Sequence, residues 1–104
     1  MTHAHTTELD ILVGSARHRL DALHETHERL DRIRFRASSP NNTVTVVADG
    51  SGAMVDLELA ENLGATTAHV LASTITATAA EAAAGALDLH EAILQSLQAS
   101  FTDS

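Results

Sequence analysis

The stretch from Thr43 to Leu59, TVTVVADGSGAMVDLEL, decides the fold of this chain of 104 residues. It begins with a β-branched run, passes through Asp49-Gly50-Ser51-Gly52, and then alternates apolar with polar side chains. β-Branched runs and period-two alternation indicate strands, and the short Asp/Gly segment between them is typical of a hairpin turn. The stretch therefore predicts two antiparallel strands. The side chains expected to face inward are Val44, Val46, Val55, Leu57 and Leu59.

A third strand is expected immediately upstream, at residues 32 to 37. The segment RIRFRA places three arginines on one face and Ile33, Phe35 and Ala37 on the other. The following residues, SSPNN, have the composition of a turn. The three strands together predict an antiparallel meander.

Two long helices are expected to flank this meander. In the first, from Thr7 to Asp31, a seam of residues recurs at alternating steps of four and three, which favours a partner helix alongside. The second starts at a cap formed by Thr66 or Thr67 and runs to about Phe101. The first seam is Leu9, Val13, Ala16, Leu20, Leu23, His27 and Leu30; the second helix has the stripe Leu71, Ile75, Thr78, Ala82, Ala86, Leu89, Ile93 and Leu97.

The order α-β-β-β-α predicts an α+β fold, with residues 7–104 forming a single domain and residues 1–6 a disordered tail. The middle of the second helix, from Thr76 to Ala86, consists almost entirely of small residues. Two interpretations stay open for it: a simple fit against the sheet, or a tight contact with another subunit.

The chain is acidic, with a formal charge of −8, and it contains neither cysteine nor lysine. All six of its basic residues are arginines between residues 17 and 36, and residues 37 to 104 carry eight acidic residues and no basic one. A long-range basic field is therefore absent, so an anionic partner would be met only by the first helix and the first strand.

Catalytic and metal-binding patterns are missing from the sequence. His24-Glu25-Thr26-His27 spaces its imidazoles by three residues, whereas the zinc-protease helix places them four apart. No nucleophile elbow and no glycine-rich phosphate loop occur. We expect no enzyme activity, no catalytic residue, no metal and no cofactor. No segment has the length of apolar sequence that a membrane span needs, so we expect a cytoplasmic protein without membrane contact.

The arginines are the remaining candidates for a binding site. On the first helix, Glu25 precedes Arg29 and Glu28 precedes Arg32 by four residues, a spacing that favours ion pairs. In a meander, the middle strand would separate Arg34 and Arg36 from Asp56 and Glu58 on the third strand. Two interpretations are equally supported: a phosphate-binding ridge, or a charged edge strand that resists aggregation. The ridge would consist of Arg29, Arg32, Arg34 and Arg36.

Self-association is expected because 104 residues are marginal for burying a large core. The expected dimer contacts are Leu20, Leu23, His27 and Leu30, from the seam of the first helix. His27 has two candidate roles, as a polar seam residue that sets helix register or as an interface group whose protonation weakens association.

The chain resembles the YbaB/EbfC family of bacterial nucleoid-associated proteins over roughly residues 8 to 100. The resemblance rests on the long first helix, on VTVVADG from Val44 to Gly50, on VDLE from Val55 to Glu58, and on Leu63 in the link to the second helix. Its alanine and aspartate content also resembles actinobacterial members, some of them linked to type VII secretion. The chain differs from the family pattern in having no basic residue in its second helix.

The resemblance implies a homodimer that binds double-stranded DNA with weak or no sequence preference and is associated with the nucleoid. The alternative function is a protein-interaction module, for example secretion-associated, that has lost DNA binding and docks a protein partner.

Overall fold

The computed structural model describes the backbone of residues 2 to 102 and the side chains of residues 7 to 102. Its elements are α1 (Thr2–Asp31), β1 (Arg34–Ser38), β2 (Val44–Asp49), β3 (Met54–Leu59) and α2 (Ala68–Thr102). The predicted α-β-β-β-α order and the α+β class are confirmed. The first helix begins at Thr2, earlier than predicted, because no glycine or proline interrupts the segment before Thr7.

The three strands form one antiparallel sheet in the order β1-β2-β3. In the turn between β1 and β2, Asn42 adopts a φ of 59°, the left-handed conformation that asparagine tolerates. In the turn between β2 and β3, Gly52 has a φ of 85°, and Asp49 accepts hydrogen bonds from Ser51 and Ala53. A register shift lies between Val47 and Ala48. Local turn chemistry thus holds both hairpins where the sequence predicted them.

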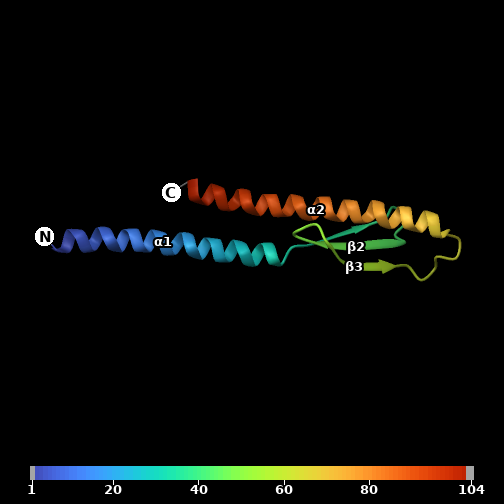
Figure 1. Cartoon of the computed structure of the whole chain (residues 1–104), viewed down its shortest axis with the longest axis horizontal. Coiled ribbons are helices and arrows are strands. Elements are labelled where there is room, and N and C mark those ends of the chain that lie inside the picture. Colours follow the sequence, from blue (N-terminus) through green and yellow to red (C-terminus); the bar gives the residue numbers. More distant parts are fainter. Residues whose placement is uncertain (1, 103–104) are drawn as a thin grey trace.

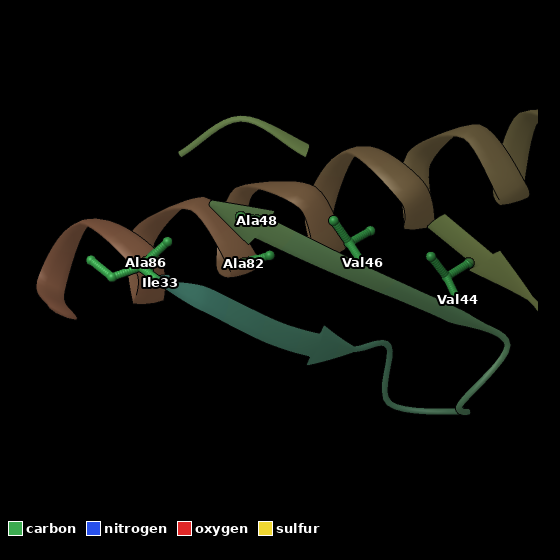
Figure 2. Close-up of a cluster of buried hydrophobic side chains, with 6 residues drawn as sticks. All are labelled: Ile33, Val44, Val46, Ala48, Ala82 and Ala86. Carbon is green, nitrogen blue, oxygen red and sulfur yellow. The ribbon is translucent and has the colours of Figure 1, made fainter. Parts of the chain in front are cut away.

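Helix α2 begins at the predicted cap, since the Val70 amide donates to Thr67 Oγ1 at 3.2 Å. The helix packs over β1 and β2 and barely touches β3. Figure 2 shows the resulting core between the helix and the middle strand. This core is small, and consists of Ile33, Val44, Val46, Ala48, Ala82 and Ala86.

The close approach of α2 to the sheet depends on Gly85. A Cβ placed at this position would lie 2.2 Å from the ring of Phe35 on β1, so a side chain there would displace the ring. Phe35 and Ala37 therefore face the helix, as predicted, while the arginines between and beside them face away.

The molecule is elongated, with extents of 83 × 19 × 15 Å. Figure 1 shows that α1 extends away from the sheet, along the C-terminal half of α2, so α2 is the helix that covers the sheet. The side of α1 against α2 contains Ala22, Thr26 and Leu30. Because these positions are four residues apart and mostly small, they let the two helices approach closely.

Most of the predicted seam of α1 does not face α2, because α1 packs through the side that contains Ala22, Thr26 and the last seam residue, Leu30. Within the described side chains, the seam's large residues are uncovered: Leu9, Val13, Leu20 and Leu23 are 46–59% exposed. On α2, the stripe prediction is correct for Thr78, Ala82 and Ala86, which are buried. It is wrong for Leu89, which is 41% exposed because the sheet does not extend beneath it.

The prediction that β3 contributes to the core is also wrong. Val55, Leu57 and Leu59 are 46%, 37% and 43% exposed, although Val44 and Val46 on the neighbouring strand are fully buried. The register pairs Val44 with Leu59 and Val46 with Leu57, so these side chains do lie on the helix side of the sheet. They stay exposed because α2 lies over the other two strands.

Candidate nucleic-acid interface

Arg34 and Arg36 lie together on the face of the sheet that α2 does not cover. Both are exposed, whereas Phe35 between them is half-buried against the helix. Period-two alternation on one strand therefore puts two guanidinium groups on the same open face. The structure brings this pair of predicted residues together.

Arg36 forms an ion pair that the order of residues in the sequence does not reveal. Its Nη2 donates to Glu58 Oε2 at 2.9 Å, across the middle strand. The expectation that β2 would separate these two side chains is wrong, because both are long enough to meet above the smaller side chains of β2. The Arg36 and Glu58 side chains are 63% and 54% exposed. Such an exposed pair contributes only about 0.2–1 kcal/mol, so an approaching phosphate can compete with Glu58 for Arg36.

Arg34 is held by the backbone at the start of β1. Its Nη1 donates to the carbonyl of Ile33 at 2.7 Å and to that of Asp31 at 3.4 Å. Arg34 also stands opposite Asp49 in the β1–β2 register. No ion pair involves Arg34 within the described part of the chain, so the charge itself is not neutralised by direct contact.

The hairpin beside Arg34 contains an acidic group with a perturbed pKa. The Ser51 hydroxyl, at 2.7 Å from Asp49 Oδ1, is the main cause that lowers the pKa of the Asp49 carboxyl. The backbone amides of Ser51 and Ala53 and the positive charge of Arg34 act in the same direction, against the opposing effect of burial. Asp49 is therefore a charged hydrogen-bond acceptor that holds the turn, and its charge lies near Arg34.

Arg29, near the end of α1, and Arg32, just after it, have different neighbours. Arg32 Nη2 is 3.9 Å from Glu28 Oε2, which confirms the predicted pair, and both side chains are more than two-thirds exposed. Arg29 lies in the shallow groove between α1 and the end of α2, beside Glu25, Ser96 and Ser100. The predicted pair between Glu25 and Arg29 is absent from the ion pairs of the described residues.

The predicted dimer contacts fall into two groups. Leu20 and Leu23 are 52% and 46% exposed, whereas Leu30 packs against the core of its own chain. His27 is exposed, and its Nε2 lies 3.3 Å from Asp31 Oδ2 on the next turn of the helix. His27 is therefore a solvated side chain within this protomer, with a carboxylate beside it.

A hollow near Arg34 is lined by residues from segments that are far apart in the chain. His90 of α2 joins it, and its Nδ1 is buried with no hydrogen-bond partner among the described residues. The described residues include no group of three or more side chains able to hold a metal ion. The residues that line this hollow come from three separate parts of the chain, so no short sequence pattern could have predicted it. The lining residues are His27, Leu30, Asp31, Arg34, Asp49, Gly50, Ser51 and His90.

Comparison with known proteins agrees with this fold. The model of the YbaB/EbfC DNA-binding family matches residues 8–101. Among solved structures, the crystal structure of an uncharacterized protein, HP0035 from Helicobacter pylori, is similar with a TM-score of 0.65. The sequences are 14% identical, and the match covers 84% of this chain and 92% of that chain. None of the curated proteins matches. Because the family match spans nearly the whole chain, the protein belongs to the YbaB/EbfC family of nucleoid-associated DNA-binding proteins.

Proposed function

We propose that this protein binds double-stranded DNA as a homodimer, with weak or no sequence preference, through Arg29, Arg32, Arg34 and Arg36. The observation that carries the proposal is the pair Arg34 and Arg36 on an open sheet face. Guanidinium groups on an open face can bind phosphate oxygens, and such contacts release counterions without reading bases. Membership in a DNA-binding family supports this assignment.

The overall charge of −8 does not by itself prevent such binding. At about 0.1 M salt the Debye length is about 10 Å. Along a molecule 83 Å long, acidic groups on distant parts of α2 are therefore screened from the arginine face. The acidic residues that matter are the near ones, which are in contact with an arginine or close to one: Glu25, Glu28, Asp49 and Glu58.

A dimer is supported by the surface that one chain leaves exposed. A folded monomer of 10.9 kDa is expected to expose about 5,600 Å². This chain exposes 7596 Å², an excess of roughly 2,000 Å². A stable interface buries about 800 Å² or more on each partner, so a second copy can account for this excess. The proposed contacts on α1 are Leu20, Leu23 and His27, which are all exposed in one chain. Leu30 is the fourth proposed contact residue, and it packs against the core of its own chain beneath them.

The proposed dimer carries eight copies of the four arginines and acts without catalysis or cofactor, in the cytoplasm at the nucleoid. The test is fluorescence anisotropy with duplexes of unrelated sequence, titrated over a range of salt. We expect a steep, linear fall of log affinity with log salt. Arg36→Ala should reduce the slope by about 0.9 for each lost phosphate contact, and a dimer loses two.

The matched control is Arg17→Ala, which removes the same charge from α1 outside the four proposed residues. An equal effect of both substitutions would assign the salt dependence to net charge and remove Arg36 from the site. Absence of DNA binding at micromolar dimer and low salt would contradict the proposal as a whole.

The second candidate function is docking of a protein partner. It is favoured by Leu9, Ile11, Leu12 and Val13 near the start of α1, which are 48–67% exposed. A partner helix could bind such an apolar segment through residues spaced three and four apart. Substituting Leu9 and Val13 by Ser would then abolish partner capture and leave DNA binding unchanged.

A further inference from the structure

The hollow beside Arg34 is large enough for a small molecule. Its volume is about 410 Å³, and ligand pockets usually have volumes of about 300–1,000 Å³. The end of α1, the start of β1, the β2–β3 turn and α2 all contribute to its lining. Leu30 supplies an apolar surface, and several polar side chains surround it. Polar groups that converge on a hollow of this kind can fix the orientation of a ligand.

Arg34 and Asp49 bring opposite charges to the hollow, and both have hydrogen-bonding atoms to spare. They stand opposite each other in the β1–β2 register, yet no ion pair joins them among the described residues. Arg34 uses its Nη1 for two backbone carbonyls, and no hydrogen bond of the described residues uses its Nε or Nη2. Asp49 uses its Oδ1 to hold the turn, and its Oδ2 has no partner within the same residues.

The charges around the hollow favour a ligand that is itself dipolar. One guanidinium group faces two carboxylates, Asp31 and Asp49, when the histidines are counted as neutral. A simple anion would be attracted by Arg34 but repelled by both carboxylates, and a simple cation would be repelled by Arg34. The last carbonyls of α1 carry a partial negative charge, which favours a cationic group at this end of the helix. A molecule with both charges satisfies both sides of the hollow.

His90 adds a hydrogen-bonding atom that its own chain leaves unused. It belongs to α2, a helix that is long and apolar enough to cross a membrane by length and composition. Its Nδ1 is buried and has no hydrogen-bond partner among the described residues. Buried polar atoms are normally paired, and a donor group of a ligand would supply the missing partner. The torsion χ2 of histidine is broad, so a small rotation can turn Nδ1 toward a donor in the hollow.

We propose that the hollow binds a free α-amino acid with a neutral or basic side chain. The carboxylate of the amino acid accepts two parallel hydrogen bonds from the Nε and Nη2 edge of Arg34. The ammonium group donates to Asp49 Oδ2 and to His90 Nδ1, and the side chain lies against Leu30. Asp31 at the edge of the hollow repels an acidic side chain. This inference does not depend on DNA binding.

The test is an NMR titration of the unaltered, ¹⁵N-labelled protein with L-leucine. The signals to follow are the backbone amides of Gly50 and Ser51, which line the hollow, and the imidazole ring of His90. We expect saturable shifts of these signals and little change on β3 and in the first half of α2. Absence of a saturable shift in the millimolar range would overturn the proposal.

Derivatives of leucine test the two ends of the ligand separately. N-acetyl-L-leucine lacks the ammonium group, and L-leucinamide lacks the carboxylate. Each loses a charge-assisted hydrogen bond, so we expect each to bind at least about tenfold more weakly than L-leucine. If N-acetyl-L-leucine binds as tightly as L-leucine, the hollow is a plain anion site and the proposal is wrong. Equal binding of L-leucinamide would identify a plain cation site and would also refute it.

Side-chain charge gives a further comparison on the unaltered protein. L-Lysine should bind at least as tightly as L-leucine, and L-glutamate more weakly, because Asp31 and Asp49 lie at the hollow. Tighter binding of L-glutamate than of L-lysine would contradict the proposed arrangement of charges.

Asp49→Asn tests the site itself. Asparagine retains an oxygen acceptor for the turn but loses the negative charge that binds the ammonium group. Asp56→Asn is the matched control, because it removes the same charge from β3, outside the lining of the hollow. With folding verified by circular dichroism, we expect affinity for L-leucine to fall about tenfold in Asp49→Asn and to stay unchanged in Asp56→Asn. Equal affinities of the two variants would overturn the proposal, and the ligand series above decides the question if Asp49→Asn does not fold.

The outcome for this hollow is separable from that for DNA. A protein that binds duplex DNA but shows no saturable shift with L-leucine refutes this inference and leaves the proposed function standing. A protein that binds L-leucine in the predicted order of ligands but binds no DNA confirms the inference and refutes the proposed function.

Discussion

The ion pair between Arg36 and Glu58 leads to a prediction in which removing a carboxylate strengthens DNA binding. If Arg36 binds a phosphate, each protomer must first break the ion pair between Arg36 and Glu58. The two charged groups of this pair are 2.9 Å apart, and both side chains are more than half exposed. A pair of this kind contributes about 0.2–1 kcal/mol. A dimer breaks two such pairs, so the total cost is about 0.4–2 kcal/mol. The substitution Glu58→Gln removes this cost, so the affinity of the dimer for DNA should increase about 2- to 30-fold.

The control for this experiment is Asp56→Asn. Asp56 is on the same strand, carries the same charge and lies opposite Val47, which in turn stands opposite Arg36. No ion pair of the described residues includes it. Both substitutions remove the same long-range repulsion, so the difference between them measures the pair alone. Anisotropy titrations at one salt concentration provide both affinities. Equal affinities for Glu58→Gln and Asp56→Asn would refute the assignment of Arg36 to the DNA contact.

The remaining predictions concern stability, measured by thermal unfolding at fixed protein concentration. Gly85→Ala should destabilise the protein by up to about 2 kcal/mol, because displacing Phe35 costs about 1–3 kcal/mol and helix propensity returns only about 1. Gly14→Ala, with nothing within 4 Å of its Cβ, should stabilise by up to about 1 kcal/mol, and equal effects of both would contradict the close packing. Thr67→Ala should cost about 1 kcal/mol through loss of the α2 cap, and a neutral result would exclude that cap. The lowered pKa of Asp49 means that its contribution is present above about pH 4 and is lost as pH falls through the folded-state pKa. The melting temperature of Asp49→Asn should therefore approach that of the wild type on acidification, and a constant difference would disprove the linkage.

Local sequence determined the order of elements and the turns between them. The β-branched run at Thr43 to Ala48 and the turn residues Asp49 and Gly52 act over a few residues, and their hydrogen bonds form within the hairpin itself. The capping hydroxyl of Thr67 also acts within one helical turn. For this reason the strands, the hairpins and the start of α2 could be predicted with boundaries shifted by only one or two residues.

Tertiary structure alone decided which apolar faces are covered. The alternation in β3 correctly separates Leu57 and Leu59 from Asp56 and Glu58, but it contains no information on where α2 lies along the sheet. Likewise, the seam of α1 is a real feature of the sequence, yet α1 meets α2 through Ala22 and Thr26 because small residues allow the helices to approach. Periodicity defines a face, whereas long-range packing selects its partner.

For the candidate DNA-binding site, too, the sequence determined one part of the arrangement and the tertiary structure determined the other. The sequence alone placed Arg34 and Arg36 on one face, since alternation along a strand is a local property. Only the folded sheet brought Glu58 to Arg36 and the Asp49 turn to Arg34, because these contacts depend on the register between strands that are distant in the chain. The sequence therefore determined which cations share a surface, and the tertiary structure determined which carboxylates compete with DNA for them.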